Sequence, residues 1–229
     1  MKEAPFLELT ILMPCLNEAK TVGACVDIAM AYLQSCGCTG EVLVCDNGSS
    51  DNSAAVARSR GARVICCGER GYGCALRFGL KHARGAYIIM GDSDLSYDFS
   101  AIGEMHHLLL DGADMVIGNR FASPPDPKAI SLVHRIGAPL LSWAARMRFG
   151  CDVVDFHCGL RGVSAGALER MHLSSSGMEF STEMIAEACR KNLRIEQTPV
   201  VLRQSGREGP SHLRTVRDGF RHLFLILRG

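Results

Sequence analysis

The stretch AYIIMGDSD, residues 86–94, decides the fold and points to the chemistry of this chain. A short apolar run that ends in polar residues is typical of a buried β-strand. Asp92 and Asp94 follow that run directly and stand two residues apart, so both carboxylates can bind one hard cation. A divalent ion held there can bridge to a diphosphate and neutralise its charge. The two acids also fit a plainer interpretation, an N-cap and a turn aspartate before the next helix.

The sequence around this stretch alternates between strand and helix patterns. The expected strands cover residues 9–13, 41–45, 62–66, 86–90 and 115–117. The expected helices run from residue 22 to near residue 37, over 54–58 with Ser50 or Asp51 as the cap, over 73–83 and over 105–110. Such alternation predicts an α/β fold with a mainly parallel central sheet flanked by helices. Ligands of such sheets bind beyond the carboxyl ends of the strands, so a site is expected there.

The composition narrows the class of protein. The 229 residues suffice for one large domain, and 47% hydrophobic and 21% charged residues are ordinary for a globular protein. A net charge of +1 gives no reason to expect a nucleic-acid partner. The N-terminal MKEAPF lacks the basic and apolar regions of a signal peptide, and the sequence contains no run of eighteen apolar residues. We therefore expect a cytoplasmic chain that does not span a membrane.

The chain contains 11 cysteines, scattered along its length. An odd number of cysteines without a signal peptide indicates reduced thiols rather than a disulfide framework. Cys36 and Cys38 lack the paired CxxC spacing of a zinc site, as do Cys66 and Cys67. The spacing therefore favours structural or incidental cysteines.

The end of the first expected strand carries polar residues. Pro14 is expected to stop the strand ladder, because proline has no backbone N–H to donate. Asn17 and Glu18 come next and are placed to face a ligand. They also fit a helix start, with Asn17 as the cap and Glu18 favoured by the helix dipole.

The second and third strands end in residues of similar potential. Asp46 can accept hydrogen bonds from a base or a ribose, and it also fits an Asx-turn at Gly48. Gly71 and Gly73 permit close backbone approach, and free amides of the helix that follows could receive phosphate. The pattern GxG is weak by itself and does not match the GxGxxG fingerprint of a dinucleotide fold.

Five motifs in this order resemble a known family. They are PCLNEA at 14–19, VLVCDNGSSDNS at 42–53, ERGYGCALRFGLKHARG at 69–85, YIIMGDSDLSYD at 87–98 and VIGNRF at 116–121. This order resembles the family 2 glycosyltransferases of GT-A (Rossmann-like) fold. Within them it is most similar to the polyprenyl-phosphate sugar synthases of the dolichol-phosphate mannose or glucose synthase type. The likeness is strong over residues 9–121 and looser through VVDFHCGLRG, GMEFSTEMI and REGPSHL.

The resemblance implies a binding site for a nucleotide diphosphate sugar. The residues that it implies for donor binding are Pro14, Leu16, Glu18, Asp46, Gly71, Gly73, Asp92 and Ser93. Asp92 and Asp94 would hold Mg²⁺ or Mn²⁺ against the donor diphosphate, with Ser96 as a further ligand. The chain departs from the family pattern at three positions. Leu16 stands where an aromatic residue is common, Asn47 replaces a frequent second Asp, and Ser93 replaces a frequent Ala.

Arginines in the second half suggest an acceptor that carries phosphate. A phosphate monoester is largely ionised at neutral pH and needs no catalytic base, but it does need arginine, whose planar fork matches its oxygens. The resemblance assigns Arg120, Arg135 and Arg207 to acceptor binding, with His212 in the same motif as Arg207. Each arginine taken alone also fits a solvated surface charge.

The remaining polar residues of the second half have several possible roles. Glu183 lies on an expected helix that begins near residues 178–180, and it could be a catalytic base, a sugar ligand or a structural anchor. Arg120 and Glu183 join the two aspartates as candidate catalytic residues. Asp155 and His157 could belong to the site or to the core.

Two segments have the pattern of helices that lie on a membrane surface. Residues 136–149 form an apolar helix with a basic flank, and residues 213–228 place four arginines beside Phe220, Phe224 and several aliphatic side chains. Both segments could equally pack on the core or on a second subunit. The sequence is consistent with a homo-oligomer but does not indicate one.

The sequence therefore predicts one glycosyltransferase domain over residues 1–229. Residues 1–121 would bind the nucleotide sugar, 122–212 the acceptor, and 213–229 would be an amphipathic tail. The expected reaction is inverting transfer of a hexose from a UDP- or GDP-sugar to polyprenyl phosphate, by a protein peripheral to the cytoplasmic membrane face. One alternative is transfer to a soluble hydroxyl acceptor with a carboxylate base. Another is a nucleotide-sugar-binding module without turnover.

Overall fold

The computed structural model describes residues 7–122, 132–207 and 214–228. Its strands form one seven-stranded sheet in the order β3-β2-β1-β4-β6-β5-β7. Strand β6 pairs antiparallel with both β4 and β5, and the other neighbours pair in parallel. The strands are β1 (Leu7–Cys15), β2 (Gly40–Asp46), β3 (Arg63–Cys66), β4 (Gly85–Met90), β5 (Met115–Asn119), β6 (Arg161–Ser164) and β7 (Ile195–Pro199). The α/β class and the mainly parallel sheet are thereby confirmed.

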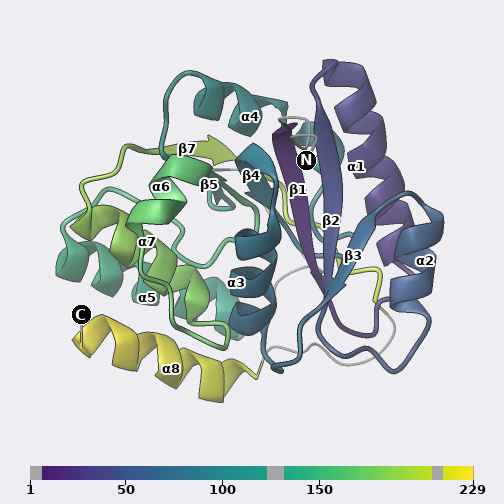
Figure 1. Ribbon diagram of the computed structural model, residues 1–229. Coiled ribbons are helices and arrows are strands. Elements are labelled where there is room, and N and C mark those ends of the chain that lie inside the picture. The colour runs from purple at the N-terminus through teal and green to yellow at the C-terminus, as the bar shows by residue number, and fades with distance from the viewer. Residues whose placement is uncertain (1–6, 123–131, 208–213, 229) are drawn as a thin grey trace.

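Helices cover both faces of this sheet. The helices are α1 (Val22–Cys36), α2 (Ser53–Ser59), α3 (Tyr72–His82), η1 (Phe99–Ala101), α4 (Gly103–Leu110), α5 (Leu132–Phe149), α6 (Ala165–Arg170), α7 (Phe180–Arg190) and α8 (Thr215–Arg228). Helices α1 and α2 pack on one face, and α3 packs on the other (Figure 1). Helices α5, α7 and α8 pack against one another beside the sheet.

The hydrophobic core lies along β1 and β4, which occupy the middle of the sheet. Ile11 and Leu12 of β1 and Ile89 and Met90 of β4 are all 0% exposed. Parallel strands that are buried on both faces have to be apolar on both, which explains why these strands read as continuous apolar runs rather than as alternating patterns.

Two local expectations are wrong. Pro14 does not stop its strand, because β1 continues to Cys15 and pairs with β2 through Asp46. The pairing of β1 with β4 ends at Leu12, two residues before Pro14, so the missing N–H of Pro14 faces a side that has no partner strand. Helix α2 has Asn52 at its N-cap instead of Ser50 or Asp51.

Helix α1 ends where the sequence predicts. Gly37 is its C-cap and has a left-handed backbone with φ of 68°, a conformation that glycine adopts without steric cost. Among the described residues, no helix is both long and apolar enough to cross a membrane.

Candidate active site

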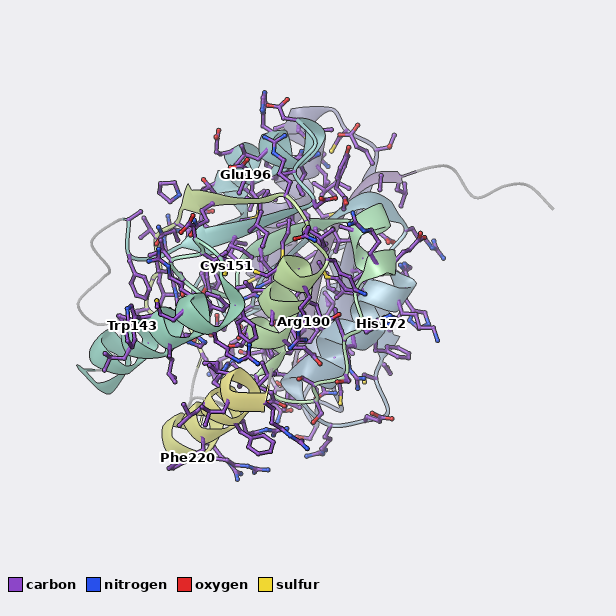
Figure 2. All side chains as sticks on the ribbon, turned by 90° about the vertical axis from the view of Figure 1, so that its left-hand side faces the viewer. Trp143, Cys151, His172, Arg190, Glu196 and Phe220 are labelled. Carbon is purple, nitrogen blue, oxygen red and sulfur yellow. The ribbon has the colours of Figure 1, made fainter. Side chains whose placement is uncertain are left out.

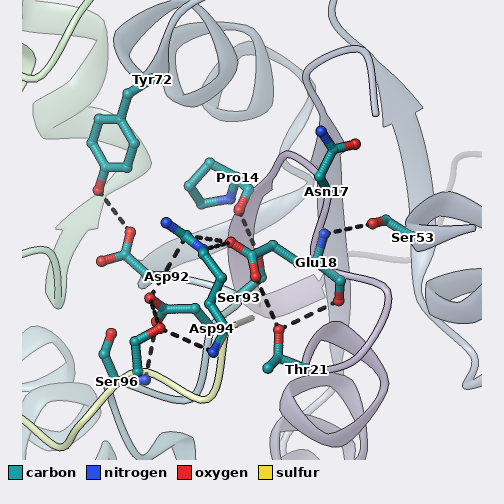
Figure 3. A network of polar contacts seen from close by, with 12 residues as sticks. Pro14, Asn17, Glu18, Thr21, Ser53, Tyr72, Asp92, Ser93, Asp94 and Ser96 are labelled. Carbon is teal, nitrogen blue, oxygen red and sulfur yellow. Dashed lines mark hydrogen bonds and ion pairs between the residues drawn. The ribbon is translucent and has the colours of Figure 1, made fainter. Parts of the chain in front are cut away.

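The carboxyl ends of the parallel strands β1, β2 and β4 bring four acids to one edge of the sheet. Glu18 follows β1, Asp46 ends β2, and Asp92 and Asp94 follow β4. Cys15 pairs with Asp46 in the β1–β2 register, so the two strands end side by side. Figure 3 shows Glu18 and the two aspartates in one network of polar contacts. This edge is where ligands of open α/β sheets bind.

Asp92 has one oxygen in a hydrogen bond and one that faces a glycine. The Tyr72 hydroxyl donates to Asp92 Oδ1 at 3.1 Å (Figure 3). On the other side, a Cβ atom on Gly159 would lie 2.8 Å from Asp92 Oδ2, so only glycine leaves this oxygen its space. The Tyr97 hydroxyl and the N–H of Gly159 are 2.9 Å apart, which fixes the loop in place. Gly159 is a further candidate site residue, which the sequence reasoning missed although it lies in a motif of the looser resemblance.

Asp94 is held by the segment that follows β7. Its Oδ1 accepts the N–H of Ser96 at 3.0 Å, and its Oδ2 accepts the hydroxyl of Ser205 at 2.8 Å. The hydrogen bond from Ser96 agrees with the interpretation of one acid as a turn aspartate. The interpretation of the other acid as an N-cap is wrong, because Asp98 is the N-cap of the next helix and accepts the N–H of Ser100. The two acids that follow β4 are therefore not helix caps.

The charge of this acid pair is incompletely balanced. Burial, and then the nearby charge of Asp94, raise the pKa of Asp92 to about 6. A carboxyl with a raised pKa is one whose ionised form lacks stabilisation, and a bound cation would supply it. Carboxylate oxygens are the ligands that Mg²⁺ and Mn²⁺ prefer. The donor set thus fits a divalent ion.

Arg207 reaches into this site from the C-terminal part of the chain. Its Nε donates to Glu18 Oε1 at 2.6 Å, and its Nη2 contacts the same oxygen. Nη2 also lies 3.7 Å from Asp94 Oδ2. The hydroxyl of Thr21 donates to Glu18 Oε2 at 3.1 Å. Burial raises the pKa of Glu18, although Arg207 and Thr21 act against the rise.

Asp46 combines a turn with an open acceptor. Its Oδ2 accepts the N–H groups of Gly48 and Ser49, both at 3.3 Å, so the expected Asx-turn is present. Its Oδ1 is buried and has no hydrogen-bond partner among the described residues. A buried acceptor without a donor is costly, and a ligand hydroxyl or amide would satisfy it.

The glycines that precede α3 serve the chain's own packing. A Cβ on Gly71, which has φ of 140°, would lie 2.2 Å from the Ser176 carbonyl oxygen, and one on Gly73 would lie 2.4 Å from that of Ser175. The N–H of Cys74 donates to the same Ser176 oxygen at 3.2 Å. The expectation that the amides of this helix are free for phosphate is therefore wrong at Cys74.

Glu183 holds the segment that covers those glycines. Its Oε1 accepts the N–H and the hydroxyl of Ser174 at 2.9 and 2.7 Å, and its Oε2 accepts the N–H of Ser175 at 2.9 Å. Of the three roles that the sequence left open, this geometry favours the structural anchor.

Arg120 is paired with a buried acid. Its Nε and Nη2 donate to the two oxygens of Asp155 at 2.6 and 2.8 Å, a bidentate fork. The Asp155 side chain is 0% exposed and that of Arg120 is 14% exposed. Burial alone would raise the pKa of Asp155, but the hydrogen bonds and charge of Arg120 hold it below its usual value. Two of the three nitrogens of this guanidinium are thus engaged within the protein.

The other predicted site residues are distributed as follows. The Ser93 hydroxyl donates to the Pro14 carbonyl at 2.8 Å and joins the ends of β1 and β4 (Figure 3). Leu16 is half-buried in the loop after β1. Arg135 lies within α5, but its side chain falls outside the described residues, as does the whole of His212.

His157 belongs to the packing of α8. Its ring contacts that of His222 edge-on, with centroids 4.6 Å apart. The Thr182 hydroxyl lies 2.8 Å from Nδ1 of His222. Burial lowers the pKa of both histidines, that of His222 to about 4. The burial of His157 fits the core interpretation, but its Nε2 is buried without a hydrogen-bond partner among the described residues.

The α/β fold and the acids at its strand ends are compared here with known protein families and structures. The profile described as "Glycosyl transferase family 2" matches residues 10–171, so the chain belongs to this family. The crystal structure of glucosyl-3-phosphoglycerate synthase from Mycobacterium tuberculosis, in complex with Mn²⁺, UDP and glucosyl-3-phosphoglycerate, superposes with a TM-score of 0.76. It covers 96% of this chain and 78% of its own at 22% identity, which establishes the GT-A-like fold.

Two of the similar proteins come from the archaeon Haloferax volcanii. The low-salt glycan biosynthesis hexosyltransferase Agl6 is 37% identical over 221 residues, which are 96% of this chain and 53% of Agl6. The chain thus spans about half the length of that relative. A more distant relative, a dolichyl-phosphate hexose transferase, is 24% identical over 208 residues, 91% of this chain and 88% of its own.

Proposed function

We propose that this protein is a metal-dependent, inverting hexosyltransferase. It would transfer a hexose from a UDP- or GDP-sugar to polyprenyl phosphate at the cytoplasmic face of a membrane. The observation that carries the proposal is the pair Asp92 and Asp94 after β4, at the same edge of the sheet as the open acceptor of Asp46 at the end of β2. Family membership and the hexosyltransferase relative support it.

The donor half would lie within residues 1–121. Asp92 and Asp94 would hold Mg²⁺ or Mn²⁺, with Ser96 beside them, and the bound ion would neutralise charge on the leaving diphosphate. Asp46 Oδ1 would accept a hydrogen bond from the base or ribose. The related synthase was crystallised with Mn²⁺ and UDP, which supports this use of the site.

The acceptor half, residues 122–212, would contribute arginines. Arg207 would bind the acceptor phosphate, because its guanidinium already lies among the site acids. Arg120 would contribute Nη1, the nitrogen that forms no hydrogen bond within the described part of the chain. Arg135 and His212 are proposed on the motif alone. An ionised phosphate needs no base, and the three hydrogen bonds that occupy Glu183 argue against transfer to a hydroxyl with this acid as base.

Helix α8 supports a lipid-borne acceptor, because it buries two polar side chains against the protein and exposes several apolar ones. Asp218 and His222 face the protein and are 8% and 6% exposed, whereas Phe220 and Leu227 are 68% and 72% exposed. The neighbouring helix α5 exposes Leu140, Trp143 and Met147. Figure 2 shows Trp143 and Phe220 on the outside of these two helices. Apolar side chains flanked by arginines are typical of helices that lie in a lipid interface.

Two assays on the purified chain test the proposal. Flotation with anionic liposomes should carry the protein upward, and label from the donor sugar should enter the lipid extract when Mn²⁺ is present. Asp94→Asn should abolish the transfer, whereas the control Asp111→Asn, at an exposed position beyond α4, should preserve it. Label that appears only in a water-soluble product would refute the lipid acceptor. Donor affinity and turnover that survive EDTA would refute the metal.

A further inference from the structure

A second group of metal-ligating side chains lies at the opposite end of the sheet. Cys36 ends α1, Cys38 precedes β2, and His106 lies on α4. The two sulfur atoms and a ring nitrogen of His106 all lie within 4.8 Å of one another. Glu8, near the start of β1, places Oε1 3.3 Å from Nε2 of His106. The acids of the candidate active site follow the other end of the strands, roughly 20 Å away along β1.

The turn at Gly37 produces the sulfur pair. Its left-handed backbone, with φ of 68°, reverses the chain directly after α1. As a result the Cys36 and Cys38 sulfurs come to 2.7 Å from each other. In a tetrahedral zinc site two sulfurs at about 2.3 Å from the ion lie about 3.8 Å apart, so these two thiols would have to separate by about 1 Å to bind one ion. The CxC spacing by itself does not predict a metal site.

His106 offers a ring nitrogen to this cluster. The side chain is 4% exposed, and its Nδ1 lies 3.1 Å from the Tyr32 hydroxyl. Nε2 is buried and lies 3.3 Å from Glu8 Oε1, outside the geometry of a hydrogen bond. A histidine that binds a metal commonly uses its other nitrogen to bond an orienting group, and Tyr32 is placed to be that group.

We propose that Cys36, Cys38 and His106 form a binding site for Zn²⁺, with a water molecule as the fourth ligand. Two thiolates, an imidazole and a water molecule are ligands that zinc accepts in tetrahedral sites. The site would join the end of α1 to α4, and it would lie at the other end of the strands from the candidate active site. Zinc binds the thiolate form of cysteine, so binding would convert two thiols to thiolates and release two protons for each Zn²⁺ bound.

The test uses the reduced, folded chain after metal removal by dialysis. Zn²⁺ should bind at one ion per chain in this site, release protons and raise the melting temperature. Co²⁺ should give the visible and near-ultraviolet absorption of a tetrahedral thiolate complex. Cys36→Ser together with Cys38→Ser should abolish that absorption and weaken Zn²⁺ binding more than about a hundredfold. Glu8→Gln should weaken it less, because Glu8 contacts His106 and lies outside the ligand cluster.

Two matched controls separate this site from other thiols and from the candidate active site. Cys151→Ser with Cys189→Ser removes another pair of neighbouring thiols and should leave the cobalt absorption intact. Asp92→Asn with Asp94→Asn should also leave it intact, so loss of sugar transfer and loss of zinc are distinguishable. Absorption that is missing in the reduced wild type, or that persists without Cys36 and Cys38, would overturn the proposal. So would a reduced wild type that binds Zn²⁺ no better than the double serine variant.

Discussion

Breaking the buried pair of Arg120 and Asp155 should be among the most destabilising single changes in this chain. The Asp155 side chain is 0% exposed and accepts four hydrogen bonds. Two come from the Arg120 guanidinium, one from the backbone N–H of Arg120 and one from the backbone N–H of His157. Asp155→Ala removes all four and leaves a buried cation without its partner. The cost of such a change is about 3–5 kcal/mol. Chemical denaturation followed by circular dichroism measures it directly.

The reverse change should cost less. Arg120→Ala leaves Asp155 two backbone N–H donors, and the carboxyl can take up a proton to shed its charge. The double variant Arg120→Met, Asp155→Leu should be closer to wild type than Asp155→Ala is, because it removes both buried charges and retains volume. A free energy of unfolding within about 1 kcal/mol of wild type for Asp155→Ala would refute the reasoning. It would mean that the pair exists to hold a ligand rather than to stabilise the fold.

Two further predictions concern the packing around the site. Gly71→Ala should lower the free energy of unfolding by about 3 kcal/mol, because φ at Gly71 is 140° and the new Cβ would meet the Ser176 carbonyl oxygen. The control is Gly166→Ala, because no atom lies within 4 Å of a Cβ built there. Equal free energies of unfolding for the two variants would contradict the prediction. Acid should weaken the packing of α8 on the protein, because folding lowers the pKa of His222 from 6.5 to about 4. Between these pH values the unfolded chain is protonated at His222 and the folded chain is not. The contribution of His222 to the free energy of unfolding should be complete above pH 6.5 and should fall by about 3 kcal/mol toward pH 4, as measured by urea titration. A His222→Gln variant with the same pH profile as the wild type would contradict this prediction.

The first half of the fold was predictable from local pattern. Every expected strand from residue 9 to residue 117 is present. The central parallel strands are buried on both faces and therefore leave a continuous apolar run in the sequence. Strand β6 and strand β7 were not predicted. Residues 161–164 contain an arginine and a glycine in four positions, and the buried Arg161 is satisfied by carbonyl oxygens of Cys158 and Ser181 that no local pattern reveals.

The candidate site residues divide along the same line. Asp46, Asp92 and Asp94 could be placed at one edge of the sheet from the sequence, since parallel strands end at a common edge. The partner of Glu18 could not be predicted. Arg207 stands 189 residues from Glu18 in the chain, and nothing near either residue indicates the contact.

The sequence by itself determined the strand ends and the acids that they carry, because apolar periodicity and chain breaks act over a few neighbouring residues. Only the tertiary structure decided which polar side chains contact other groups of the protein. Arg120 pairs with Asp155, Glu183 accepts hydrogen bonds from Ser174 and Ser175, and the thiols of Cys36 and Cys38 lie beside His106. Those contacts depend on strand order and on how helices pack across the sheet. Both arise from the summed burial of the whole chain, which no single segment encodes.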